Sequence, residues 1–487
     1  MTTYTNPNPM TEEEQLLHMS EAYRNLWNAD VQERIRRDIE SYRKADASCC
    51  VSAIPEGTEV SVEQISHQFI FGAHIFNFDQ LGTDERNRRY RELYGTLFNS
   101  ATIAFYWSAF EPEEDHCRFS GEYRDSAEFW NRCPNPKEQP HWRRPATDPV
   151  VEFCESKGIR LHGHTLTWGN HTWQYPRWQL AKLPKEYLVQ MMTDVRCGTN
   201  FMSKSAGEMA ELIPEYTEEL NRLMELRIRR IAGHYRGRIH SWDVVNESAS
   251  DFANKRLVPG SRLCKSVYGL MPGDYPFRSM QIADDAFPGN VKLNINDYFL
   301  TDEYVEETAD LIRRGCRIDI MGAQMHLFNP QTCLDIADGK SEVQSPASVR
   351  ETMERLSKAN LPIHLSEITI TSPGNDARGQ IIQAVIARNL YRLWFSIPKM
   401  MGITWWNVVD DCGAPGEPSV SGLFTRDMQP KSSYFALNDL INREWKTRTS
   451  VTAGKDGQIE FRGFRGTYRL RWLSAEGKEK ETFLTLN

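Results

Sequence analysis

The sequence predicts an α/β protein, a (β/α)8 TIM barrel with a small β-rich appendage built from both ends of the chain. Two observations predict the barrel: eight short apolar runs follow one another, and amphipathic segments separate them. Strands that alternate with helices pair in parallel, and eight such units over ~350 residues fit a barrel with insertions. The predicted strands are residues 67–75, 101–107, 159–168, 239–246, 291–296, 318–325, 361–370 and 402–409.

The predicted helices are segments in which apolar residues recur at the helical spacing. One opens the chain at residues 12–45, with charged residues between its apolar positions. The clearest ones between the strands are residues 184–195, 215–235, 302–315 and 349–359.

The appendage is predicted from a different pattern near the two ends. Residues 49–54 and 58–65 alternate like strands around the turn Pro55-Glu56-Gly57, and the tail from Ser450 alternates with period 2 between glycine-rich turns. A single hairpin is marginal alone, and chain termini often lie close together, so the two segments should pair. We therefore expect an N-terminal helix and β-strands of the appendage in 1–66, a catalytic barrel in 67–445 and a C-terminal β unit in 446–487.

Composition excludes several classes of protein. The 487 residues are 40% hydrophobic and 25% charged, as in ordinary globular proteins. A net charge of −8 with no Lys/Arg block argues against a nucleic-acid partner. No stretch approaches the ~20 apolar residues of a membrane span, which argues against a membrane partner. The ten cysteines contain no CxxC pair and are interpreted mostly as free buried thiols.

The first ten residues are polar and lack the apolar region of a secretion signal. As the chain stands, this predicts a cytoplasmic protein; if a leader has been removed, it is secreted or periplasmic. Aromatic residues make up 11% of the chain, which fits a carbohydrate binder, although core packing explains most tryptophans equally well.

Two glutamates stand at the ends of apolar runs far apart in the chain. Glu247 closes Trp242-Asp243-Val244-Val245-Asn246-Glu247, and Glu367 lies late in Ile363-His364-Leu365-Ser366-Glu367-Ile368-Thr369-Ile370. A buried carboxylate costs stability unless it is paired, hydrogen-bonded or used. A salt bridge would explain either glutamate alone. Two of them at the carboxyl ends of barrel strands are what acid–base hydrolysis of a glycosidic bond requires.

Two other functions compete with this interpretation. His162 and His164 form an HxH pair that also begins metal-dependent hydrolase sites, with His326 and His364 as further candidate ligands. The two glutamates would then have no role, so we expect neither a metal nor an organic cofactor. A barrel that binds glycans without cleaving them is the second alternative.

Six segments resemble family 10 glycoside hydrolases, the xylanase-type retaining enzymes, in the family's order from about residue 67 to 440. They are His162-Gly163-His164-Thr165-Leu166-Thr167-Trp168, Trp242 to Glu247, Asn296-Asp297-Tyr298, Gln324-Met325-His326-Leu327, Leu365 to Ile370, and Trp406-Asn407-Val408-Val409-Asp410.

The resemblance implies a retaining β-glycoside hydrolase that acts on an oligo- or polysaccharide. Glu247 would be the general acid/base and Glu367 the nucleophile, with carboxyl groups ~5–5.5 Å apart. It further implies that His164 and Asn246 bind the reacting sugar, that Gln324 and His326 orient that sugar and the nucleophile, that Asn296 lies near Glu247, and that Trp168 and Trp406 form the walls of the site.

Three departures from the family pattern concern the outer sugar subsites. On strand two, the family's Glu-Asn-x-Met-Lys-Trp run is replaced by residues 102–107, so Tyr106 stands where the family has Lys. After Trp168 the chain has Gly169-Asn170-His171 instead of His-Ser-Gln, and no second Trp follows Asp410. Tyr106 and His171 are therefore predicted substrate contacts, in subsites widened for hexoses or decorated sugars.

An insertion at residues 113–148 follows strand two and contains Trp130, Trp142, Arg143 and Arg144. Long loops in compact domains are often functional, and this one would lie on the active-site face. Two roles are open for the insertion: it covers the outer sugar subsite, or it only packs against the barrel. The sequence favours neither role.

Overall fold

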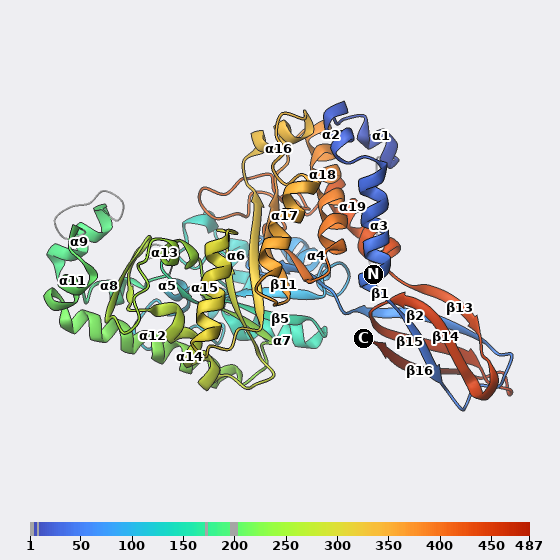
Figure 1. Ribbon diagram of the computed structural model, residues 1–487, viewed down its shortest axis with the longest axis horizontal. Coiled ribbons are helices and arrows are strands. Elements are labelled where there is room, and N and C mark those ends of the chain that lie inside the picture. Colours follow the sequence, from blue (N-terminus) through green and yellow to red (C-terminus); the bar gives the residue numbers. More distant parts are fainter. Residues whose placement is uncertain (1–3, 7–8, 171–173, 195–202) are drawn as a thin grey trace.

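The predicted barrel is confirmed. The computed structural model describes residues 4–6, 9–170, 174–194 and 203–487. Its centre is a closed, parallel, eight-stranded barrel in the order β10-β11-β12-β3-β4-β5-β6-β9 (Figure 1). The barrel strands are β3 (Ile70–His74), β4 (Ser100–Ala104), β5 (Arg160–Trp168), β6 (Ser241–Asn246), β9 (Lys292–Asp297), β10 (Ile320–Leu327), β11 (Ile363–Ile370) and β12 (Met400–Trp405).

Helices surround the barrel, and the four predicted between strands are present as α9, α12, α15 and α17 (Figure 1). The barrel helices are α4 (Asp84–Glu92), α5 (Trp107–Phe110), α7 (Thr147–Ser156), α8 (Arg177–Leu180), α9 (Lys185–Asp194), α11 (Ala206–Leu212), α12 (Pro214–Tyr235), α13 (Ala249–Ala253), α14 (Tyr275–Ala286), α15 (Asp302–Arg313), α16 (Pro330–Ala337), α17 (Pro346–Ser357), α18 (Ala377–Ser396) and α19 (Ser432–Asp439), followed by the π-helical turn Leu440–Glu444. A hairpin that the sequence did not predict, β7 (Leu263–Ser266) and β8 (Gly269–Pro272), lies between α13 and α14.

Close packing in the barrel wall depends on particular glycines. A Cβ at Gly163 would lie 2.2 Å from the ring of the fully buried Trp242 on the neighbouring strand. Real Cβ atoms do not approach other atoms so closely, so only glycine lets β5 lie against this indole.

The predicted N-terminal helix 12–45 is three helices rather than one: α1 (Glu12–Leu16), α2 (Glu21–Leu26) and α3 (Ala29–Arg43). The side chains of Ser20 and Asn28 accept hydrogen bonds from the backbone of Tyr23 and Val31 and so begin new helices. This unit packs against α18, where Asn389 donates to the hydroxyl of Tyr23.

The predicted pairing of the two chain ends is also confirmed. Strand β1 (Lys44–Cys50) pairs with β14 (Gln458–Phe464), and a four-stranded sheet has the order β13-β2-β15-β16 (Figure 1). Its strands are β2 (Glu59–His67), β13 (Arg448–Thr452), β15 (Gly466–Leu473) and β16 (Glu479–Leu486). These six strands, which we call the appendage, enclose their own apolar core around Val62, Tyr468 and Leu470. The first strand lies earlier than the predicted 49–54, and the predicted C-terminal β unit of 446–487 contains the four strands β13 to β16.

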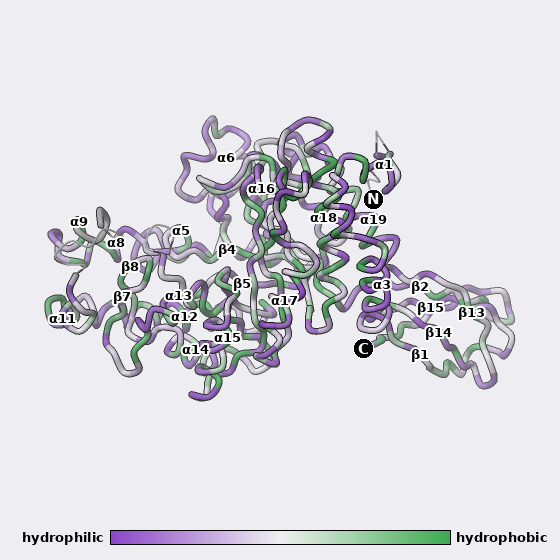
Figure 2. The backbone as a smooth tube through the Cα atoms, turned by 45° about the horizontal axis from the view of Figure 1, so that its top comes forward, coloured by the Kyte–Doolittle hydropathy of each residue, from purple (hydrophilic) through white to green (hydrophobic). Residues whose placement is uncertain are grey.

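The insertion after β4 folds as short elements joined by irregular chain. They are η1 (Tyr123–Asp125), α6 (Ala127–Arg132) and η2 (Pro136–Glu138), and the chain around α6 is largely hydrophilic (Figure 2). Two tryptophans of the insertion, Trp130 in α6 and Trp142, are buried.

Two bulk features complete the fold. No helix in the described part of the chain has the length and apolar character needed to cross a bilayer. The nine cysteines within the described residues are all free, and five of them are buried, in agreement with the prediction.

Candidate active site

A cavity of about 620 Å³ opens at the carboxyl ends of the barrel strands. Nine of the eleven predicted site residues line it: Tyr106, His164, Trp168, Asn246, Glu247, Gln324, His326, Glu367 and Trp406. Asn296 lies fully buried directly beneath, in contact with two of them. His171 falls outside the described residues.

Glu247 follows β6 in a left-handed backbone conformation, with φ of 59°. Such a conformation is uncommon for a residue with a Cβ, and here the backbone N–H of Glu247 is held by the carbonyl of Asn296 at 2.8 Å. The carboxylate accepts hydrogen bonds from Trp168 Nε1 at 2.9 Å and from Gln324 Nε2 at 3.2 Å. The site therefore holds Glu247 by its backbone and by both carboxylate oxygens.

The surroundings of Glu247 favour its neutral form. Burial raises its pKa to about 7, and the negative charges of Asp297 and Glu367 act in the same direction. The hydrogen bonds from Gln324 and Trp168 act in the opposite direction without cancelling this effect. Near neutral pH the carboxyl group can therefore both give and take a proton.

Glu367, on β11, lies close to one amide donor and two histidine rings. Asn296 Nδ2 donates to its Oε1 at 2.9 Å, and Oε1 also lies 3.8 Å from His164 Nδ1. Its Oε2 lies 3.4 Å from His326 Nε2, whose other ring nitrogen meets the hydroxyl of Thr369 at 2.9 Å. These contacts aim the carboxylate into the cavity.

Asn296 connects the two glutamates through a network of amides. Its Nδ2 donates to Asn246 Oδ1 at 2.8 Å as well as to Glu367, while the hydroxyl of Ser366 donates to its Oδ1. Gln324 Nε2 lies 3.4 Å from the same oxygen of Asn246 and also reaches Glu247. A Cβ at Gly322 would lie 2.5 Å from Asn296 Oδ1, so glycine at that position makes room for the amide.

The two histidines of the HxH pair hold a carboxylate between them. Asp243 Oδ2 lies 2.9 Å from both His162 Nε2 and His164 Nδ1. Burial alone would lower the pKa of His164, but the hydrogen bond to Asp243 and the charges of Glu367 and Asp243 outweigh burial and raise it. A positive His164 would stabilise the negative charge of Glu367.

Aromatic rings form one wall of the cavity. Trp406, Tyr106 and Phe76 pack as a small buried cluster, with Trp168 at its edge. The guanidinium of Arg144, from the end of the insertion, lies 3.7 Å from the centre of the Tyr106 ring. The ring of Tyr106, a predicted substrate contact, is therefore covered on one face by a cation.

Glu417 takes a central place in the loop that follows β12, where the sequence showed no second tryptophan. Its carboxylate accepts hydrogen bonds from Trp406 Nε1 at 3.0 Å and Asn407 Nδ2 at 2.9 Å, and it lies 3.2 Å from Arg143 Nη1. Burial raises the pKa of Glu417, but the charge of Arg143 and these hydrogen bonds lower it to about 2.

Sequence reasoning missed Glu417 and also Tyr268, at the turn of the unpredicted β7–β8 hairpin. The hydroxyl of Tyr268 lies 3.0 Å from that of Tyr298. Burial and the nearby charge of Glu247 raise the pKa of Tyr268. Only the Gly269 turn signalled this hairpin in the sequence, whereas Glu417 had no local signal.

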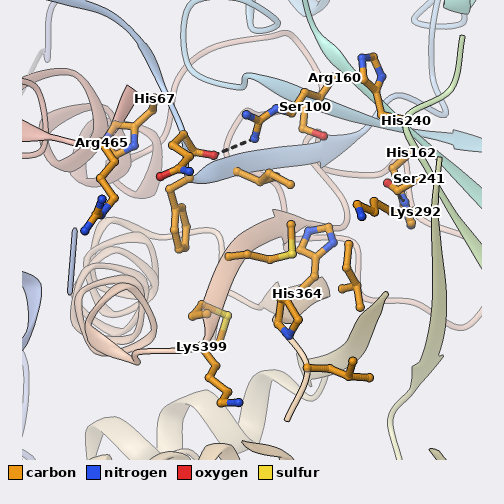
Figure 3. Close-up of a pocket in the computed structure, with 18 of the residues that line it drawn as sticks. His67, Ser100, Arg160, His162, His240, Ser241, Lys292, His364, Lys399 and Arg465 are labelled. Carbon is orange, nitrogen blue, oxygen red and sulfur yellow. Dashed lines mark hydrogen bonds between the residues drawn. The ribbon is translucent and has the colours of Figure 1, made fainter. Parts of the chain in front are cut away.

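A second cavity, of about 670 Å³, opens at the opposite end of the barrel, where the strands begin (Figure 3). Arg160, Lys292, Lys399 and His364 line it, and His162 lies at one side, next to Ser241 and Lys292. Neither Glu247 nor Glu367 reaches it, so the acid–base pair belongs to the cavity at the carboxyl ends alone.

Comparison with known proteins agrees with this geometry. The model of the family described as glycosyl hydrolase family 10 matches residues 65–440. Among solved structures, xylanase 10B from Thermotoga maritima aligns with a TM-score of 0.53 at 22% identity, over 77% of this chain and 96% of that protein. Xylanase B from Clostridium stercorarium F9 aligns with a TM-score of 0.51 at 22% identity, over 76% of this chain and 97% of that protein. At such identities the likeness concerns the fold.

Among curated proteins, endo-1,4-beta-xylanase B of Thermotoga neapolitana is 25% identical over 311 residues, which cover 61% of this chain and 74% of that protein. Anti-sigma-I factor RsgI6 of Acetivibrio thermocellus is 26% identical over 350 residues, which cover 70% of this chain but only 36% of the factor. The match thus spans about a third of that relative's length.

Proposed function

Because the chain belongs to glycosyl hydrolase family 10, we propose that it is a retaining, xylanase-like β-glycoside hydrolase that cleaves a β-linked glycan by double displacement. The single observation that carries the proposal is the pair Glu247 and Glu367. The two carboxyl groups come from different strands, line one cavity and have different environments.

In the first step, Glu367 attacks the anomeric carbon while Glu247 donates its proton to the leaving oxygen. Glu247 then takes a proton from water, and that water releases the sugar from Glu367. The contacts from Asn296, His164 and His326 would stabilise Glu367 as an anion until it attacks. The pKa of about 7 suits Glu247 to both of its roles.

The other predicted residues would then bind the reacting sugar. The side-chain oxygen of Asn246 is engaged by Asn296, so its Nδ2 is the group available to a sugar hydroxyl. Trp168 and Trp406 would supply the apolar faces against which the ring packs, and Gln324 would orient the sugar beside Glu247. His171 stays a prediction for this site.

Several similar curated proteins carry the name endo-1,4-beta-xylanase, which makes xylan the first substrate to examine. We propose further that the outer subsites accept hexoses or decorated sugars. Tyr106 with Arg144 replaces the family's lysine on strand two, and Glu417 occupies the loop from which the second tryptophan is missing.

The test is incubation with xylan, β-glucan and substituted oligosaccharides, with products identified and their anomeric configuration followed by NMR. We expect β-products first, because two displacements restore the configuration. Initial α-products would overturn the mechanism. Much faster cleavage of plain xylan than of any glucoside or substituted glycan would overturn the widened subsites.

A glycan-binding barrel without activity is the alternative, and it shares the same cavity. One relative carries the name of an anti-sigma factor rather than that of an enzyme. A chromogenic aryl β-glycoside separates the two functions, because a binding protein gives neither turnover nor a bell-shaped pH profile.

A further inference from the structure

Arg144 is a charged side chain in the wall of the active-site cavity that the proposed mechanism does not use. It lines the cavity together with Glu247 and Glu367. Cζ of its guanidinium lies 3.7 Å from the centre of the Tyr106 ring and 5.1 Å from the centre of the Phe76 ring. A stacked guanidinium is held in orientation while its edges stay free for hydrogen bonds.

Within the described residues, Arg144 has no carboxylate partner. Its one side-chain hydrogen bond runs from Nη1 to the backbone oxygen of Arg143 at 2.8 Å. The neighbouring Arg143, in contrast, pairs with Glu417 at 3.2 Å and also donates to Asn407 at 3.0 Å. Two adjacent arginines thus enter the same cavity, and among the residues that the structure describes only Arg143 has a carboxylate at ion-pair distance.

An unpaired charge in this position is costly. Burial lowers the pKa of Arg144 to about 10; the charge of Arg143 adds to this effect, whereas Tyr106 and the charge of Glu417 oppose it. The guanidinium stays protonated at neutral pH, at a cost in stability. A residue that is only structural would be expected to have a partner for its charge. The missing partner is therefore best sought in the ligand.

Arg144 lies close to the reaction centre. The Tyr106 ring beneath it is 5.5 Å from the His164 ring and 5.8 Å from the Trp168 ring, measured between centres. His164 in turn lies 3.8 Å from Glu367, and Trp168 donates to Glu247. A group that binds Arg144 would thus belong to the reacting sugar or to the sugar next to it.

We propose that Arg144 binds an anionic substituent of the glycan, and that the preferred substrate carries a carboxylate, as uronic acids do, at or next to the reacting sugar. This inference rests on the proposed glycoside hydrolysis. The planar fork of a guanidinium matches the two oxygens of a carboxylate in a bidentate pair. A sulfate ester offers related chemistry and is treated as a separate arm of the test.

The experiment uses one oligosaccharide backbone in three forms: with a uronic acid branch, with the same branch after reduction of its carboxyl group, and with a sulfate ester at that position. The readout is kcat/KM for each form with the 487-residue chain. Charged hydrogen bonds are worth roughly 10- to 100-fold in binding, so the acidic form should exceed its reduced counterpart by about 10-fold or more. Equal values for the two would overturn the proposal, and a preference for the sulfate ester alone would overturn the choice of carboxylate.

Substitutions of Arg144 test whether this residue causes the preference for the acidic substrate. In Arg144→Gln, kcat/KM for the acidic substrate divided by kcat/KM for the reduced substrate should fall to about one. Arg144→Lys should retain part of this preference, because a lysine keeps the charge but not the planar fork of the guanidinium. The matched control is Arg132→Gln, an exposed arginine of the same insertion that pairs with Glu128. Its ratio should equal that of the unaltered protein, and a ratio that survives in Arg144→Gln would overturn the assignment.

Failure of this inference differs from failure of the proposed function. If the enzyme cleaves all three forms equally, it is a glycosidase in which Arg144 does not recognise an anionic substituent. A protein that cleaves none of them, nor any aryl β-glycoside, refutes the hydrolase itself. Folding of each arginine variant is checked by its thermal unfolding temperature.

Discussion

The indole nitrogen of Trp168 lies 2.9 Å from Oε2 of Glu247 and donates a hydrogen bond to it. One side chain thus has two tasks: its ring borders the sugar site, and its N–H acts on the proposed acid/base. The first two predictions follow from this relationship and from the pKa of Glu247.

The pH dependence should show an alkaline limb near pH 7. Glu247 must be protonated to donate to the leaving oxygen, and its pKa in the free protein is about 7. We therefore expect kcat/KM to fall about tenfold per unit above that pH, since the protonated fraction falls in this way. A profile that stays flat to pH 9 would contradict the assignment.

Trp168→Phe should shift that limb to higher pH. The hydrogen bond from Trp168 favours the charged form of Glu247, so its loss raises the pKa of the carboxyl group further. Trp406→Phe is the matched control, because the Trp406 indole donates to Glu417 instead. The pH profile of kcat/KM checks both variants; equal shifts would show that ring loss rather than the hydrogen bond is responsible.

The two glutamates should differ in their dependence on the leaving group. Glu247→Gln should slow hydrolysis of unactivated glycans by about 10²- to 10⁴-fold, the usual contribution of general acid catalysis. With a dinitrophenyl leaving group, which needs no proton, this variant should still give a burst of released phenol. Glu367→Gln should give no burst with either substrate. If both variants behave alike with the activated substrate, the roles are misassigned.

The appendage should contribute to stability but not to turnover. Leu470 is fully buried in the appendage core, and Leu470→Ala should cost about 2–5 kcal/mol of unfolding free energy. None of the described cavity-lining residues belongs to the appendage, so kcat at 25 °C should not change. Leu473→Ala is the control at an exposed position and should lie within ~0.5 kcal/mol of the unaltered protein.

This experiment also tests the division at residues 66 and 445, which stays a prediction. Two separate unfolding transitions, with only the first moved by Leu470→Ala, would support a barrel and an appendage that unfold independently. One transition that moves as a whole would argue for a single cooperative unit.

The barrel was predictable because each of its strands is a short apolar run, and burial on both faces leaves such a run few alternatives. The glutamates stood out for the same reason, as polar residues where the pattern demands apolar ones. The breaks in the N-terminal helix were missed although their signals were present. Ser20 and Asn28 are good N-cap residues, and their hydrogen bonds to the backbone of Tyr23 and Val31 outweigh the continuous helical periodicity.

Residues that reach the cavity from loops could not be predicted. Arg144 arrives at the end of a long insertion and Glu417 from the loop after β12, and no periodicity fixes where such chain passes. Within the predicted β unit of 446–487, the bounds of strand β16 could not be read, because an exposed edge strand with charged residues lacks the apolar alternation of an internal one. Contacts between distant loops depend on the whole fold rather than on local sequence.

The ion pair of Arg143 and Glu417 makes two otherwise unrelated loops interdependent. In a chimaera that takes the segment after β4 from a xylanase, Glu417 would lose the positive charge of Arg143. If the segment after β12 were exchanged instead, Arg143 would lose the negative charge of Glu417. Loop grafting in this protein should therefore succeed only when both segments are exchanged at the same time. Homologous recombination within the gene would be expected to preserve the two segments as a pair.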